Sequence, residues 1–361
     1  MYKKIYKIRQ ILKNENLDCL FISDQANVSY LTDFKGISPN ERECFALITI
    51  NNLYLFTFPT YFELYNKEFS NFIVINITPS KKLHQILQEI IGKEEIRSFG
   101  FEKANITMSE YEKLGCLQKI KLVPAENLIE NFRVVKEEQE ITNIRKAANI
   151  SDKAMKYGRG IIKAGISEKD LALKLEFFIK KQADDIAFLP IVAFNSHSSI
   201  PHYLPSDKTL LIDNSLILID IGAKINNYCS DITRVFFYKS PSSEQLEVYE
   251  TVKKAQELAI NSVKPGISGA LADKIAKDYI ISKGYPEYMH GLGHGVGINI
   301  HEDPRLKSGR DDILSKNMVF SIEPGIYLTG KYGIRIEDLV VLREKGPIII
   351  SKAPKDNIIL K

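Results

Sequence analysis

The sequence predicts an α/β protein of two domains: an α/β domain over residues 1–125, then an α+β domain with pseudo-twofold symmetry over residues 126–361. Three observations predict this. A chain of 361 residues exceeds what one hydrophobic core usually organises. Apolar strands and amphipathic helices intermix in the first third of the chain. Two helices followed by a hairpin then occur twice, which suggests two similar halves around a shared centre.

The first domain is expected to begin with an amphipathic helix over residues 1–12. Ile5, Ile8, Ile11 and Leu12 share one helical face, the pattern of a helix packed on a core. This stretch lacks the small-residue cleavage site of a signal peptide, and no run in the chain approaches transmembrane length. The other expected elements are a helix over 81–91 and strands over 18–23, 44–50, 53–58 and 98–102, with Asn51-Asn52 as the turn between the middle two.

The second domain is expected to start near Pro124 and to repeat one structural unit. Apolar residues at helical spacing predict its helices, and β-branched runs interrupted by turn residues predict its hairpins. The expected elements are a long helix that starts over 135–150, a helix over 168–182 and a hairpin over 216–237. Helices over 243–263 and 271–283 and a hairpin over 318–341 are expected to follow.

Each predicted hairpin carries two carboxylates. Asp220 and Asp231 belong to the first hairpin, and Glu323 and Glu337 belong to the second. Because side chains alternate along a strand, each pair is expected on one face of its hairpin. A single Asp in an apolar strand is more often structural, but two hairpins with the same arrangement indicate a common purpose. Like charges facing each other destabilise a sheet, so bound cations are the expected compensation.

A glycine-rich segment between the hairpins carries three histidines. His290 and His294 are four residues apart, which on a helix would indicate a zinc-peptidase motif. Glycine occupies every second position from 291 to 297, and each costs a helix about 1 kcal/mol, so a helix is not expected. The glycines are instead expected to let the backbone approach a metal centre and substrate closely. One histidine of the segment, which also includes His301, is predicted to be a ligand and the others to line a pocket.

Overall composition limits the classes of partner. The chain has 49 basic and 45 acidic residues, a net charge of +4, which does not favour a nucleic-acid partner. The absence of a transmembrane run gives no reason to expect a membrane partner. Four cysteines lie scattered without CxxC spacing, the usage expected of reduced thiols in a cytoplasmic protein.

Taken together, these motifs resemble the pita-bread metallopeptidases, in the branch of Xaa-Pro dipeptidases (prolidases) and Xaa-Pro aminopeptidases. The resemblance implies a creatinase-like α/β domain over 1–125, for scaffolding or oligomerisation, and a pita-bread catalytic domain over 126–361. The chain departs from the branch at Phe194, Asn195 and His197, where many members carry a small-residue pair and an asparagine. The matching stretches are Ile-Asp220-Ile-Gly, Ser-Asp231-Ile-Thr-Arg, His-Gly-Leu-Gly-His294-Gly-Val-Gly, His301-Glu-Asp-Pro-Arg, Ile-Glu323-Pro-Gly-Ile-Tyr and Gly-Ile-Arg335-Ile-Glu337-Asp.

The resemblance implies two divalent metal ions per chain. Asp220 would bind one ion, His294 and Glu323 the other, and Asp231 and Glu337 would bridge both. The residues themselves agree, because four carboxylates balance the charge of two divalent cations and a neutral imidazole can ligate. This oxygen-rich set suits Mn²⁺ or Co²⁺, with Zn²⁺ and Fe²⁺ as alternatives.

The resemblance also implies roles around the ions. His202 and His301 would bind substrate, stabilise the oxyanion and transfer protons, with Glu323 as a further proton carrier. Arg335, two residues before Glu337, would orient the bridging carboxylates. His290 would line the pocket, and Arg305 would either bind a substrate carboxylate or form a surface salt bridge.

The resemblance implies hydrolysis of the Xaa-Pro bond in short proline-containing peptides, by a homodimer. Two alternatives stay open at this point: a methionine aminopeptidase, and a pita-bread module that binds peptides or partners without turnover. The sequence does not choose between a dipeptidase and an aminopeptidase.

Overall fold

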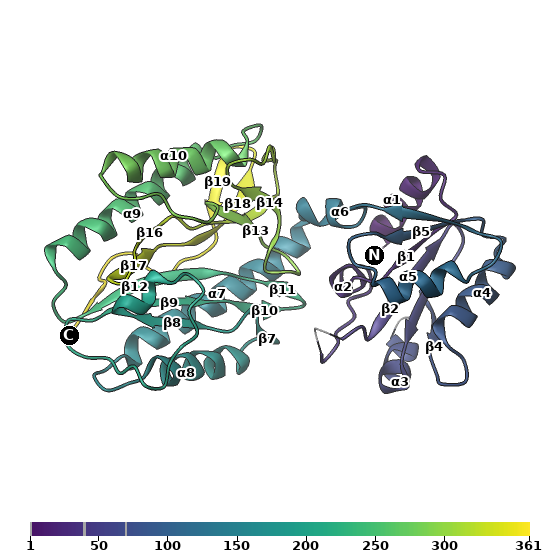
Figure 1. Cartoon of the computed structure of the whole chain (residues 1–361), viewed down its shortest axis with the longest axis horizontal. Coiled ribbons are helices and arrows are strands. Elements are labelled where there is room, and N and C mark those ends of the chain that lie inside the picture. The colour runs from purple at the N-terminus through teal and green to yellow at the C-terminus, as the bar shows by residue number, and fades with distance from the viewer. Residues whose placement is uncertain (1, 39–40, 69–70) are drawn as a thin grey trace. The chain divides into compact units, whose positions relative to one another are not determined.

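The computed structural model describes residues 2–38, 41–68 and 71–361. The chain forms two compact units, Met1–Arg133 and Val134–Lys361. In Figure 1 the first is drawn in purple and blue, and the second runs from blue-green to yellow.

Unit 1 is built on a six-stranded mixed sheet of order β4-β3-β2-β1-β5-β6, which confirms the predicted α/β class. β1 pairs antiparallel with β2 and parallel with β5, so antiparallel and parallel pairing meet at β1. The predicted turn is present, because the Thr49 amide donates to the Asn52 carbonyl at 3.0 Å. The strands are β1 Cys19–Ile22, β2 Cys44–Thr49, β3 Leu53–Thr57, β4 Ile73–Asn76, β5 Ser98–Glu102 and β6 Lys121–Ala125.

Helices of unit 1 pack against this sheet. On the first helix, Ile5, Ile8 and Leu12 are buried, as expected of an ordinary amphipathic helix. The sequence reading missed the shorter helices, whose apolar stripes are too brief to show periodicity. The helices are α1 Tyr2–Asn14, α2 Gln25–Thr32, α3 Pro59–Glu68, α4 Leu83–Lys93, α5 Met108–Gly115 and, at the end of the unit, α6 Glu130–Val134.

The polypeptide beyond residue 125 still belongs to unit 1. The Asn27 side-chain amide donates to Glu130 at 2.7 Å and its oxygen accepts from Arg133 at 2.7 Å. These bonds hold the start of α6 on α2, so the compact unit ends after Arg133 rather than near residue 125.

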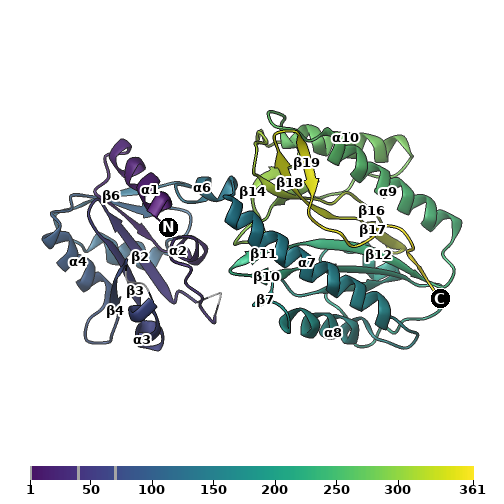
Figure 2. The same cartoon turned by 180° about the vertical axis from the view of Figure 1, so that it is seen from behind.

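Unit 2 repeats the order of two helices and a hairpin. α7 (Glu138–Ile161) and α8 (Glu168–Lys180) precede the first hairpin, and α9 (Ser243–Ser262) and α10 (Gly269–Ser282) precede the second. Figures 1 and 2 show each helix pair flanking the strands. The predicted α+β arrangement with two similar halves is therefore confirmed, and α7 is the long helix expected to start within residues 135–150.

The strands of unit 2 form four sheets. The largest two have the orders β14-β13-β15-β18-β19 and β20-β12-β9-β8, and short sheets β11-β10-β7 and β16-β17 extend the hairpins. The strands are β7 Asp185–Ile186, β8 Ile191–Phe194, β9 Leu216–Ile221, β10 Ala223–Ile225, β11 Tyr228–Cys229, β12 Ile232–Tyr238, β13 Gly293–Gly295, β14 Glu302–Leu306, β15 Val319–Ile322, β16 Gly325–Leu328, β17 Tyr332–Arg335, β18 Asp338–Arg343, β19 Gly346–Ile349 and β20 Ile359–Leu360.

Each half of unit 2 has its own core. One core joins α7 and α8 to β8 and β9, and the other joins α9 and α10 to β15 and β18. The second core also takes in Leu216, Leu218, Val235 and Phe237 of the first hairpin, so the two halves pack together through apolar side chains there. Among the described residues, none of the helices combines the length and apolar character needed to cross a membrane.

Candidate metal centre

The first hairpin places its two aspartates on one face. Thr233 of β12 pairs with Asp220 of β9, and Asp231 lies two residues before Thr233. Because side chains two apart in a strand share a face, Asp220, Thr233 and Asp231 point to the same side. Both aspartates are buried, as the strand pattern predicts.

The second hairpin brings its two glutamates face to face. Ile322 pairs with Asp338 and Gly325 pairs with Arg335, in one continuous register. Glu323 therefore lies directly opposite Glu337. Without a compensating cation, two like charges at this position would destabilise the ladder.

His294 lies at the centre of the short strand β13, between β14 and β15. Its Nε2 is 3.3 Å from Glu323 Oε1 and 3.7 Å from Asp231 Oδ2. The segment is not helical, so the structure rules out a helical zinc motif here.

Two of the alternating glycines lie close to the backbone of neighbouring segments. A Cβ on Gly293 would lie 1.9 Å from the Ser321 carbonyl oxygen, and one on Gly295 would lie 2.1 Å from the Asp303 carbonyl oxygen. These two glycines thus allow a close approach of neighbouring backbone, and Gly291 and Gly293 also line the cavity described below. Packing of β13 between two strands fixes where the His294 ring emerges.

Ligand-type atoms converge between the two hairpins. One atom each from Asp231, His294 and Glu337 all lie within 4.8 Å of one another. Asp220 Oδ1, Asp231 Oδ1 and Glu337 Oε1 are buried and have no hydrogen-bond partner among the residues that the structure describes. Buried carboxylate oxygens without donors are costly, so this centre fits hard or borderline divalent cations held by oxygens and one imidazole.

The electrostatics of the protein alone support the same conclusion. Burial raises the pKa of Asp231 well above its usual range, and the charges of Glu337 and Asp220 raise it further. Burial, then Glu323 and Asp220, likewise raises the pKa of Glu337 well above its usual range. Burial would also raise the pKa of Glu323, but a hydrogen bond with His294 brings it down to about 2. All four carboxylates can be ionised together only with added positive charge.

Arg335 supplies part of that charge. Its Nη2 donates to Asp220 Oδ2 at 2.6 Å, and its Nε donates to Thr233 Oγ1 at 3.0 Å. Thr233 Oγ1 in turn donates to Glu337 Oε2 at 2.8 Å. Arg335 thus holds Asp220 directly and reaches the predicted bridging residue Glu337 only through Thr233.

Tyr327 extends this network and was not singled out from the sequence. Its hydroxyl accepts from Arg335 Nη1 at 3.1 Å and lies 2.9 Å from His290 Nε2. A Cβ on Gly325 or Gly333 would lie within 2.8 Å of the Tyr327 ring, so both glycines make room for it. Strand alternation could have found Tyr327, because it lies four residues after Glu323 on the same face.

One cavity of about 810 Å³ contains the centre, a volume suited to a small ligand. Apolar side chains such as Phe188, Ile200 and Met289 line part of it, and Lys307 adds a cation that sequence reasoning missed. All ten residues predicted from the sequence line this cavity: His202, Asp220, Asp231, His290, His294, His301, Arg305, Glu323, Arg335 and Glu337.

Two further histidines of the cavity have lowered pKa values, which favours their uncharged forms. Burial, then the charges of His294 and Arg305, lowers the pKa of His301 to about 4. Burial also lowers the pKa of His290. Arg305 lies 3.8 Å from Asp303, an ion pair that leaves both predicted roles for Arg305 open.

A buried carboxylate anchors the segment that carries His202. Glu168 at the start of α8 accepts from the Phe194 amide at 2.7 Å and the Ser206 amide at 3.1 Å, and lies 2.9 Å from His197 Nδ1. The unusual His197 therefore has a structural partner. From the sequence, Glu168 looked only like the first residue of a helix.

Comparison with known proteins agrees with this geometry. Residues 142–344 match metallopeptidase family M24, and residues 4–135 match the creatinase/prolidase N-terminal domain. The chain belongs to metallopeptidase family M24. The chain covers almost the full length of the relatives described next.

Three members of family M24 illustrate the similarity. The Xaa-Pro dipeptidase of Pyrococcus horikoshii is 34% identical over 362 residues, covering 99% of each chain. A solved Xaa-Pro dipeptidase from Bacillus anthracis superposes with a TM-score of 0.92 at 31% identity, covering 99% of each chain. An X-Pro aminopeptidase from Thermotoga maritima superposes with a TM-score of 0.88 at 34% identity, covering 96% of this chain and 98% of the other.

Proposed function

We propose that this M24 peptidase hydrolyses the Xaa-Pro bond of short peptides, as an Xaa-Pro dipeptidase or Xaa-Pro aminopeptidase. The observation that carries the proposal is the set of three buried carboxylate oxygens without donors among the described residues, at the floor of a peptide-sized cavity. The names of the full-length relatives supply the substrate class.

The proposed cofactor is a pair of divalent ions. Asp220 would hold one ion, His294 and Glu323 the other, and Asp231 and Glu337 would bridge them. The donor set favours Mn²⁺ or Co²⁺, with Zn²⁺ and Fe²⁺ as alternatives. When bound, such ions polarise a carbonyl group and lower the pKa of water to about 7.

The chain's own residues would bind and protonate the substrate. Arg305 and Lys307 place two cations on the cavity wall, which suits the carboxylate of a short peptide. His301 and His202 can each donate a ring N–H to the developing oxyanion. Departure of the proline nitrogen requires a proton, and a Glu323 oxygen, held beside His294, is the proposed carrier.

The proposal extends to the whole molecule. The creatinase-like domain, predicted over 1–125, would serve as scaffold and dimer contact, and residues 126–361 would carry the chemistry. A cytoplasmic homodimer is proposed from the scattered reduced cysteines and from the resemblance to the prolidase branch.

A paired-substrate assay tests the proposal. Purified protein loaded with Mn²⁺ or Co²⁺ should cleave an Xaa-Pro dipeptide or the same peptide extended by one residue, and should leave an Xaa-Ala control largely intact. Preference for the dipeptide would identify a dipeptidase, and preference for the longer peptide an aminopeptidase. No cleavage of either peptide with any of the four metals would refute the proposal.

A further inference from the structure

The ladder of the second hairpin is interrupted where its two glutamates lie. Pro324 opposes Ile336 in the register set by the pairs on either side. The Ile336 amide donates to the Pro324 carbonyl at 3.4 Å. Proline has no N–H, so the return bond to the Ile336 carbonyl cannot form.

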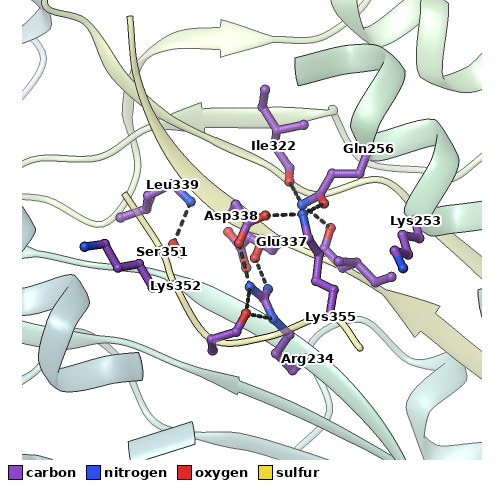
Figure 3. Close-up of polar contacts among 12 residues, drawn as sticks. Arg234, Lys253, Gln256, Ile322, Glu337, Asp338, Leu339, Ser351, Lys352 and Lys355 are labelled. Carbon is purple, nitrogen blue, oxygen red and sulfur yellow. Dashed lines mark hydrogen bonds and ion pairs between the residues drawn. The ribbon is translucent and has the colours of Figure 1, made fainter. Parts of the chain in front are cut away.

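Gln256 of α9 supplies the missing donor. Its Nε2 donates to the Ile336 carbonyl at 3.1 Å and to the Ile322 carbonyl at 3.1 Å (Figure 3). Ile322 and Ile336 immediately precede Glu323 and Glu337. One fully buried amide therefore binds the backbone next to both glutamates and links the two strands across the interruption.

Lys355 fixes which way round the Gln256 amide lies. Lys355 Nζ donates to Gln256 Oε1 at 2.9 Å and to Asp338 Oδ2 at 2.8 Å. An ammonium group can only donate and a carbonyl can only accept. The reversed amide would set its NH₂ against the ammonium and its oxygen against two carbonyls, so only the observed orientation satisfies all four groups.

The same network continues behind Glu337. Asp338 Oδ1 accepts from Arg234 Nη2 at 2.6 Å, and Arg234 Nη1 donates to the Glu337 carbonyl at 2.5 Å. Arg234 also donates to the Ala353 carbonyl, so the segment with Lys355 is fastened at a second point (Figure 3). Donors from Gln256 and Arg234 thus hold the backbone on both sides of the Glu337 side chain.

We propose that Gln256, oriented by Lys355, is a positioning residue that fixes the separation of Glu323 and Glu337 and so tunes metal affinity. Neither side chain touches the proposed ions. The inference rests on the proposed metal centre, because a fixed separation matters only if both glutamates ligate. Outer hydrogen bonds of this kind change metal affinity by about 10–100-fold in other proteins.

The test compares Gln256→Met with Thr251→Val by calorimetric titration of metal-free protein with Co²⁺. Thr251 is a matched control, because it is buried on the same helix and donates only to the carbonyl of Glu247. Gln256→Met should bind Co²⁺ about tenfold or more weakly and shift its visible absorption bands. Thr251→Val should keep wild-type affinity and spectrum.

Lys355 provides a milder pair of variants that keeps the test decisive should Gln256→Met fold poorly. Its side chain is 21% exposed, so Lys355→Met removes the ammonium with little loss of packing. Lys355→Met should weaken Co²⁺ binding, and Lys355→Arg should restore it in part. Melting of each metal-free variant shows whether it is folded.

The possible results distinguish a failure of the positioning role of Gln256 from a failure of the proposed peptidase function. Folded Gln256→Met and Lys355→Met variants with wild-type Co²⁺ affinity and spectra would overturn the positioning role alone. A wild-type protein that binds no divalent ion would overturn the proposed function itself.

Discussion

Buried carboxylates occur in both units, and they are held in opposite ways. In unit 1, Glu102 accepts from the Ser23 and Asp24 amides, each at 2.7 Å, and from the Asn27 side chain at 2.7 Å. In unit 2, Asp231 and Glu337 each keep one buried oxygen without a donor among the described residues. Burial alone therefore does not mark a functional carboxylate. An unfilled acceptor beside other carboxylates marks a site for a cation.

The largest difference between the two units is expected when one carboxylate of each is replaced. Asp231→Asn removes a proposed bridging charge, so metal binding and peptidase activity should fall by more than about 100-fold. Glu102→Gln is the matched change in unit 1 and should leave both unchanged. Metal titration and Xaa-Pro hydrolysis measure the two variants side by side, and equal losses would remove the distinction between the units.

Removal of metal should destabilise the protein, and more strongly as pH rises. The pKa values of Asp231 and Glu337 are raised in the metal-free protein by burial and by their carboxylate neighbours. A raised pKa in the folded state gives stability at low pH that is lost as pH rises through that value. Bound ions replace this protonation and add about 2.7 kcal/mol at a free concentration of 100 Kd. Melting curves with and without chelator should therefore diverge from pH 5 to pH 8, and parallel curves would contradict the charge argument.

Thr233→Val tests the difference between the units at a single hydrogen-bonding hydroxyl. It removes the donor to Glu337 and the acceptor for Arg335, so metal affinity should fall about tenfold. Thr57→Val in unit 1 is the control, because Thr57 is equally buried and donates only to the Glu43 carbonyl. Calorimetric titration of both variants with Mn²⁺ checks this, and equal affinities would show that Thr233 is not part of the centre.

The last expected effect changes the stability of unit 1 and leaves metal binding and activity unaltered. Burial raises the pKa of Glu102 to about 7, against an ordinary value of about 4.3. The pKa of Glu102 is higher in the folded than in the unfolded state, so protonation of Glu102 stabilises the fold at low pH. This stabilisation is lost as pH rises from about 4 to about 7. Glu102→Gln should remove that pH dependence and cost about 1–3 kcal/mol of unfolding free energy. Urea unfolding at several pH values tests this, while peptidase activity serves as the unchanged reference.

The sequence predicted the candidate ligands better than the residues that hold them in place. Asp220, Asp231, Glu323 and Glu337 were found because strand alternation is a local rule that places each pair on one face. His294 was assigned through the resemblance to the prolidase branch, because the glycine-rich segment alone left open which of its histidines would be a ligand.

The residues that hold the ligands in place act through contacts between parts of the chain that are far apart in sequence. Gln256 is one polar residue on a helix, and nothing local shows that it lies against the interrupted ladder at Pro324. Glu168 looked like an ordinary residue of a first helical turn. Tyr327 and Thr233 lay within reach of strand alternation, which the sequence reading applied only to the charged residues.

The number of ions that the metal-free wild-type chain binds tests the proposed metal centre most directly. Calorimetric titration with Mn²⁺, repeated in buffers of different ionisation enthalpy, measures both the ions bound and the protons released. We predict about two bound ions per chain. Protons should be released on binding, because the buried carboxylates must ionise to ligate. Binding of no ion, or binding that releases no proton, would contradict it.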